Sequence, residues 1–162
     1  MTKIHVKTNI NGDKVEFLAD PRETLLDCLR DHIGLTGSKE GCGTGDCGAC
    51  SCIFDGDLVS SCLVLGVEAE GKSIETIEGM AGEKELHPLQ KKFIEMAALQ
   101  CGFCTPGMVM AAEGLLRENA KPSVDEIRKG MAANICRCTG YVKIIESVQS
   151  AAEEIVSKEI PK

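Results

Sequence analysis

The chain has few aromatic residues and no long apolar run. Phe, Tyr and Trp together make up 3% of its 162 residues and tryptophan is missing, so any core must be aliphatic. No stretch approaches the 18 or so apolar residues of a membrane-spanning helix. The first residues also lack the apolar segment of a secretory signal. We therefore expect a cytoplasmic protein with no membrane span.

Positive charge is scarce as well. The chain carries 18 Lys and Arg against 25 Asp and Glu, a formal net charge of −7. This sign disfavours nucleic acid and anionic membrane surfaces as partners. Hydrophobic residues (43%) and charged residues (27%) lie in the range of globular proteins. The length suits one moderate domain or two small ones.

No residue pattern predicts an acid–base or nucleophilic active site. The three histidines, His5, His32 and His87, have no ligand-like spacing, and no Ser/His/Asp set or carboxylate pair can be argued. Residues Gly43–Gly48 spell G-x-G-x-x-G, but they precede a predicted strand and enclose Cys47, so a dinucleotide site is rejected. We expect no substrate chemistry in this chain.

Cysteine, in contrast, is abundant, with ten residues. In a cytosolic chain this composition indicates metal binding before disulfides. Cys42, Cys47 and Cys50 have the spacing Cys-x4-Cys-x2-Cys, the ligand run of a plant-type [2Fe-2S] cluster, which needs one more distant cysteine. Glycines between them let backbone N–H groups approach the sulfur atoms of a cluster. The loop over residues 37–50 is therefore a predicted cluster site.

Two cysteines are candidates for the fourth ligand of this site, Cys52 and Cys62. A hairpin with the three-residue loop 55–57 would place Cys50 directly opposite Cys62, with Cβ atoms about 5 Å apart. A two-residue loop would shift this register. The expected register favours Cys62, and we interpret Cys52 and Cys28 as small core residues.

A second set comprises Cys101, Cys104, Cys136 and Cys138. Each pair stands just before a predicted helix, with a threonine expected near the N-cap. The positive end of a helix dipole favours the thiolate form that a metal needs. The repeat suggests two helical hairpins, related by approximate two-fold symmetry, around one metal centre. Spacing alone leaves a second iron–sulfur cluster and a structural zinc ion as alternatives.

The residue patterns predict an α+β chain of two domains. Strands are expected at 3–10, 14–18, 51–54, 58–61 and 73–76, with a helix that opens at Pro21 and stops at Gly34. The remainder predicts four helices, with Leu86, Leu89, Phe93 and Ala97 on one face of the first and later starts near 106, 123 and 140. The predicted domains are a sheet domain over 1–76, a connection over 77–85 and a helical domain over 86–162.

Three motifs together resemble one family. They are Glu-Gly-Cys-Gly-Thr-Gly-Asp-Cys-Gly-Ala-Cys (40–50), Gln-Cys-Gly-Phe-Cys-Thr-Pro-Gly (100–107) and Asn-Ile-Cys-Arg-Cys-Thr-Gly-Tyr (134–141). The chain is similar to the small iron–sulfur subunit of molybdenum hydroxylases, the group of xanthine dehydrogenase, aldehyde oxidoreductase, carbon monoxide dehydrogenase and 4-hydroxybenzoyl-CoA reductase. The resemblance implies a plant-ferredoxin-like β-grasp domain and then a four-helix bundle, each carrying one [2Fe-2S] cluster.

The same resemblance implies partners and a function. A large subunit would hold molybdopterin and a medium subunit FAD, often in a dimer of heterotrimers. Gln100 and Cys138 would contact the molybdopterin, and the Gly43–Gly45 loop would face the flavin subunit. Single electrons would pass from molybdenum through the bundle cluster and the ferredoxin-domain cluster to FAD, or in reverse. A free-standing two-cluster ferredoxin is the alternative function.

Overall fold

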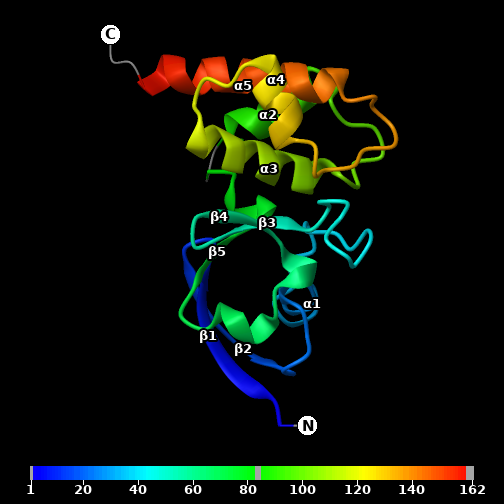
Figure 1. The fold of residues 1–162 in the computed structure, drawn as a ribbon. Coiled ribbons are helices and arrows are strands. Elements are labelled where there is room, and N and C mark those ends of the chain that lie inside the picture. Colours follow the sequence, from blue (N-terminus) through cyan, green and yellow to red (C-terminus); the bar gives the residue numbers. More distant parts are fainter. Residues whose placement is uncertain (1, 83–84, 160–162) are drawn as a thin grey trace.

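The structure is a computed structural model that describes residues 2–82 and 85–159. Its N-terminal half is built on a β-sheet and its C-terminal half on helices stacked against one side of that sheet (Figure 1). Within the described ranges, no helix is long and apolar enough to cross a membrane.

The sheet is mixed and has the strand order β2-β1-β5-β3-β4. β1 pairs antiparallel with β2 and parallel with β5, and β3 pairs antiparallel with both β4 and β5. Alternating side chains of β1, such as Val6 and Ile10, are buried, as its period-two pattern predicts. All five strands lie within one residue of their expected bounds, at Ile4–Ile10, Asp13–Ala19, Ser51–Phe54, Asp57–Ser60 and Ser73–Glu75.

The turn between β3 and β4 differs from the expectation. It contains two residues, Asp55 and Gly56, both with positive φ (50° and 96°). Asp-Gly favours a two-residue turn of this kind because its twist matches that of the flanking strands. The expected three-residue loop is therefore wrong, and Cys50 does not stand opposite Cys62 in the ladder.

The first helix begins later than expected. α1 spans Leu25–Asp27 and continues as a π-helical turn, η1, over Cys28–His32. Thr24 is the N-cap: its hydroxyl accepts a hydrogen bond from the Asp27 amide (3.1 Å), and the Asp27 carboxylate accepts one from the Thr24 amide (3.0 Å). This capping box, and not Pro21, fixes the start of the helix.

In the described part of the second half, 85–159, there are four helices. α2 spans Pro88–Glu95, α3 Thr105–Glu118, α4 Val124–Gly130 and α5 Val142–Glu159. Their core includes Leu89, Phe93, Met108, Ile127 and Val148. α3 lies between the sheet and the other helices (Figure 1), and it packs against β3 and β4. The position of α3 thus couples the helical half to the sheet.

The first of these helices, α2, is shorter than the helix that the sequence predicted. α2 buries Leu89 and Phe93, whereas Leu86 precedes it and is exposed, and Ala97 follows it with a φ of 54°. In the expected connection over 77–85, residues Ile77–Gly79 form a 3₁₀ turn, η4. Residues 83 and 84 of that connection lie outside the described ranges.

Candidate metal centres

The structure brings the four cysteines of the first set together. Cys42 is exposed, Cys47 is half-buried, and Cys50 and Cys62 are buried. Hydrogen bonds from Thr44, and then contacts with Cys47, lower the pKa of Cys42 to about 6. Burial, and then contact with Cys50, raises the pKa of Cys62 to about 11. The four thiols therefore lie as two contacting pairs, Cys42 with Cys47 and Cys50 with Cys62.

The local structure that brings Cys62 to this site differs from the one that the sequence predicted. It lies in a 3₁₀ turn, η2 (Ser61–Leu63), which follows β4 directly. The amide and the hydroxyl of Ser61 both donate to the Cys50 carbonyl, at 3.3 and 2.8 Å. Cys50 and Cys62 then share a small buried cluster with Leu26. The turn after the strand, and not the strand register, thus pairs the two cysteines.

Cys52 and Cys28 lie apart from both sets, in the apolar core of the sheet domain. Neither side chain is exposed. Burial raises the pKa of each thiol to about 12. Their burial among apolar side chains of the sheet core is that of packing residues.

The second set is assembled from two loops that are distant in the sequence. Cys101 and Cys104 precede α3, and Cys136 and Cys138 precede α5. The Sγ atoms of Cys101 and Cys138 lie 3.7 Å apart. The Cys104 and Cys136 thiols also interact, and burial followed by this contact raises the pKa of Cys104 to about 12. Two thiolates on one tetrahedral metal ion lie about 3.8 Å apart, so the spacing fits a shared metal.

A cavity of about 210 Å³ joins the two sets. Besides all four cysteines of the second set, it is lined by Cys47, Ala49, Phe103 and Ile135. Thiols from both sets therefore open onto one space. Two of its apolar lining residues, Phe103 and Ile135, are exposed (46% and 55%), so the cavity lies at the surface of the chain.

Three polar contacts support the second set. The Thr139 hydroxyl donates to Cys136 Sγ at 3.1 Å, and the Cys136 amide donates to the Tyr141 hydroxyl at 2.9 Å. Burial opposes ionisation of Cys136, but hydrogen bonds from Thr139, Cys138 and Cys104 together outweigh it and lower the pKa of this thiol. Gln100 Nε2 donates to the Cys138 carbonyl at 3.2 Å, so these two residues lie together.

The roles of the threonines differ from the expectation. α5 begins at Val142, so Thr139 lies too early to cap it and bonds to a cysteine instead. Thr105 is the first residue of α3, and Cys104 occupies the N-cap. Thr139 and Tyr141 belong to the third motif, but the sequence pattern predicted no role for the Tyr141 hydroxyl. A hydroxyl three to five residues from a candidate ligand is the signal that could have drawn attention to both.

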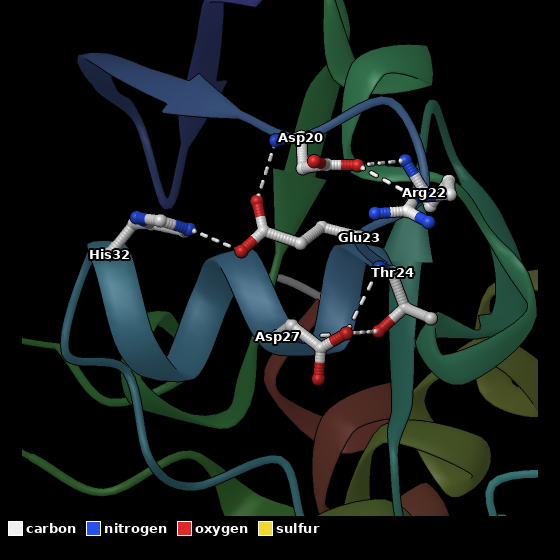
Figure 2. A network of polar contacts seen from close by, with 6 residues as sticks. All are labelled: Asp20, Arg22, Glu23, Thr24, Asp27 and His32. Atoms are coloured by element: carbon white, nitrogen blue, oxygen red, sulfur yellow. Dashed lines mark hydrogen bonds and ion pairs between the residues drawn. The ribbon is translucent and has the colours of Figure 1, made fainter. Parts of the chain in front are cut away.

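Among the described residues, a further group of ligand-type side chains lies around α1 and η1. Ligand atoms of Glu23, Cys28 and His32 lie within 4.8 Å of one another. Figure 2 shows Glu23 and His32 of this group within a network of polar contacts. The Glu23 carboxylate, however, already contacts His32 Nε2 at 3.0 Å and accepts a hydrogen bond from the Asp20 amide at 2.7 Å. Both carboxylate oxygens are thus occupied. We interpret the group as part of the polar network around the helix start.

Comparison with known proteins agrees with this geometry. Residues 8–81 match a family model described as a 2Fe-2S iron-sulfur cluster binding domain, and residues 76–149 match a [2Fe-2S] binding domain model. The chain is 46% identical to the nicotinate dehydrogenase small FeS subunit of Eubacterium barkeri (94% of this chain, 98% of that one). It is 44% identical to the xanthine dehydrogenase iron-sulfur-binding subunit of Escherichia coli O157:H7 (90% and 92%).

Solved structures show the same similarity in three dimensions. The crystal structure of quinoline 2-oxidoreductase from Pseudomonas putida 86 contains a chain that superposes with a TM-score of 0.93 at 45% identity. The match covers 99% of this chain and 100% of the matched chain.

Proposed function

Because the chain belongs to the family of small iron–sulfur subunits of molybdenum hydroxylases, we propose that it relays single electrons between a molybdopterin centre and FAD held by partner subunits. It is an electron-transfer subunit of an oxidoreductase and carries two [2Fe-2S] clusters. Substrate chemistry takes place in another subunit, and this chain supplies no catalytic residue.

The observation that carries the proposal is the gathering of eight thiols into two sets of four. Cys42, Cys47, Cys50 and Cys62 would hold the first cluster, and Cys101, Cys104, Cys136 and Cys138 the second. The 3.7 Å separation of Cys101 and Cys138 and the all-thiol donor set suit iron–sulfur ligation. Each cluster, when bound, accepts or gives up one electron. The residues of the chain would hold the iron through these thiols.

The domain structure belongs to the same proposal. Residues 1–76 form a plant-ferredoxin-like β-grasp domain, and residues 86–162 form a four-helix bundle with approximate two-fold symmetry. The strand order and the four helices α2 to α5 support this division. The two matched family models overlap at 76–81, from the last residue of the proposed first domain into the proposed connection over 77–85.

The proposed partners come from the family resemblance, and exposed residues of the two sites support them. Gln100 and Cys138, both exposed, would contact the molybdopterin of a large subunit. The Gly43–Gly45 loop, beside the exposed Leu63, would face a medium FAD subunit. We expect a dimer of heterotrimers in the cytoplasm, and all ten cysteines are free thiols in keeping with that compartment.

The choice of substrate would be made outside this chain. The relatives are named for nicotinate, xanthine and quinoline, yet this chain is 44 to 46% identical to each of them over at least 90% of its length. Similar identity to relatives that are named for different substrates is consistent with a shared electron route.

Purification from the native source tests the proposal. We expect a molybdopterin subunit and an FAD subunit to accompany the chain. Each chain should contain about four iron and four acid-labile sulfide, with two distinct EPR signals on reduction. Stoichiometric zinc in the second site would contradict the two-cluster assignment. A chain isolated alone and fully active as an electron donor would favour the free-standing ferredoxin.

A further inference from the structure

The two cysteine loops touch through main-chain groups. The Ile135 amide donates to the Cys47 carbonyl at 2.9 Å. Next to this bond, the Asn134 side-chain amide donates to the Gly48 carbonyl, also at 2.9 Å. We call these four residues, Cys47, Gly48, Asn134 and Ile135, the loop junction. It joins Cys47, a proposed ligand of the first cluster, and the residue after it to the two residues just before Cys136.

Gly48 and Asn134, at the centre of the loop junction, are buried. Asn134 is only 3% exposed, and its amide also lies 3.4 Å from the Ser51 hydroxyl, which itself donates to the Gly48 carbonyl at 2.8 Å. Among the residues that the structure describes, no buried side-chain nitrogen or oxygen lacks a hydrogen-bond partner. Loss of the Asn134 amide would therefore weaken a buried contact that water cannot readily replace.

Close packing holds the same carbonyl from a second direction. Gly48 has a φ of 65°, and a methyl group there would overlap the Asn134 side chain. A methyl group on Gly107, in the first turn of α3, would overlap the Gly48 carbonyl oxygen. The Gly48 peptide is thus enclosed between α3 and Asn134. A shift of either element would move the backbone next to Cys47.

We propose that Asn134 is a positioning residue that sets the separation of the two cluster sites. This inference rests on the proposed function and extends it. The residue contacts no proposed ligand thiol, yet it is two positions from Cys136 and it bonds to the residue next to Cys47. Since electron transfer between two centres weakens steeply as they separate, a fixed junction keeps the rate of transfer between them constant.

The test compares Asn134→Asp with the wild-type full chain, purified with its accompanying subunits. The carboxylate keeps the size of the side chain but removes the donor and faces a carbonyl oxygen. Asn9→Asp is the matched control, since its side-chain oxygen accepts from the Gly12 amide and is retained. Iron, sulfide and both EPR signals should persist in both variants, which shows that the clusters are loaded.

Two measurements then report on the loop junction. The mutual magnetic splitting of the two reduced clusters should decrease in Asn134→Asp and stay unchanged in Asn9→Asp. Hydrogen exchange of the Ile135 amide should become at least about tenfold faster in Asn134→Asp only, in line with the loss of a buried hydrogen bond. Unchanged splitting and exchange in Asn134→Asp, with both clusters present, would overturn the inference.

A second variant covers the case in which Asn134→Asp loses a cluster because of the added charge. Asn134→Ala removes the same donor without charge, and it should keep both clusters and show the same decrease in splitting. Loss of only the second cluster in both variants would mean that Asn134 serves one loop alone, which also overturns the inference. A wild-type chain without iron and sulfide would instead refute the proposed function.

Discussion

Arg117 and Glu75 form a bidentate ion pair between the helical half and the sheet. Arg117, on α3, donates from Nη1 and Nη2 to the two carboxylate oxygens of Glu75, on β5, at 2.8 and 2.7 Å. Arg117 Nε also donates to Glu113 at 2.9 Å. Paired parallel bonds of this kind are stronger than a single point contact. The ion pair therefore helps to hold α3, the helix that follows Cys104, against the sheet.

Arg117→Lys should weaken this contact because a lysine replaces the planar fork by one point charge. Both side chains are about 40% exposed (38% and 41%), so solvent screening limits the expected loss in unfolding free energy to about 0.5–1 kcal/mol. Urea unfolding followed by circular dichroism measures it. Arg128→Lys, at an exposed pair within α4, is the control and should change nothing.

The same pair should depend on pH in a defined direction. The hydrogen bonds from Arg117 hold the pKa of Glu75 below its ordinary value of 4.5. A depressed carboxyl pKa contributes stability that is complete above 4.5 and is lost as the pH falls through the lowered value. The difference between wild type and Arg117→Lys should therefore shrink in strongly acidic solution. A difference that grew with acidity would contradict this assignment.

Much of the sheet could be predicted because its signals are local. Period-two patterns and the turn residues Asn11-Gly12 and Asp55-Gly56 mark the strands within a residue. The parallel pairing of β1 with β5, which sets Asn9 against Ser73, has no local signal because the partners lie 64 residues apart in the chain. The length of the second turn was missed because both alternatives contain Asp-Gly, and only the backbone angles distinguish them.

In the candidate sites, too, local features could be predicted from the sequence and long-range contacts could not. Cysteine spacing predicts the two sets, since ligands to one metal often lie close in sequence. It does not predict the loop junction, because Asn134 and Gly48 meet only after both halves have folded. Cys62 was assigned through a wrong register, and the η2 turn brings that residue to Cys50 for a different reason.

His87 should make the stability of the helical half depend on pH near neutrality. It is the N-cap of α2, where its Nδ1 accepts from the Leu89 amide at 3.4 Å and must be unprotonated to do so. Burial lowers its pKa below 6.5, although the nearby Glu113 works in the opposite direction and Arg117 and Lys158 add to the lowering. As the pH falls, His87 is therefore protonated at a higher pH in the unfolded chain than in the folded chain.

The unfolding free energy should accordingly decrease as the pH drops through about 6.5. His87→Asn keeps a good N-cap but does not titrate, so its curve of stability against pH should be flatter over this range. Urea unfolding at several pH values between about 7.5 and about 5 provides the comparison. His5→Asn, at an exposed residue on β1, is the control and should retain the wild-type slope. Equal slopes in all three proteins would sink the prediction.

Cys62 and Cys52 offer a matched pair of buried cysteines, one proposed as a ligand and one as a core residue. Cys62→Ala should abolish the EPR signal of the first cluster and reduce iron from about four to about two per chain. Cys52→Ala should retain both clusters and lose about 1 kcal/mol of stability through a small cavity. Because both side chains are buried, burial alone cannot produce the difference. Loss of the first signal in Cys52→Ala would show that the wrong fourth ligand was assigned.

The Thr139 hydroxyl should raise the reduction potential of the second cluster. It donates to Cys136 Sγ at 3.1 Å, and a hydrogen bond to a ligand sulfur stabilises the more negative, reduced form. Thr139→Val keeps the shape of the side chain without the donor, so the potential should fall by roughly 40 mV, which corresponds to about 1 kcal/mol for one electron.

Thr139→Ser restores the donor and should restore the potential. Redox titration followed by EPR measures both clusters in one sample, and the first cluster serves as the internal reference. A shift of equal size in both signals, or in the serine variant, would mean that the threonine acts through general packing and not through its hydroxyl.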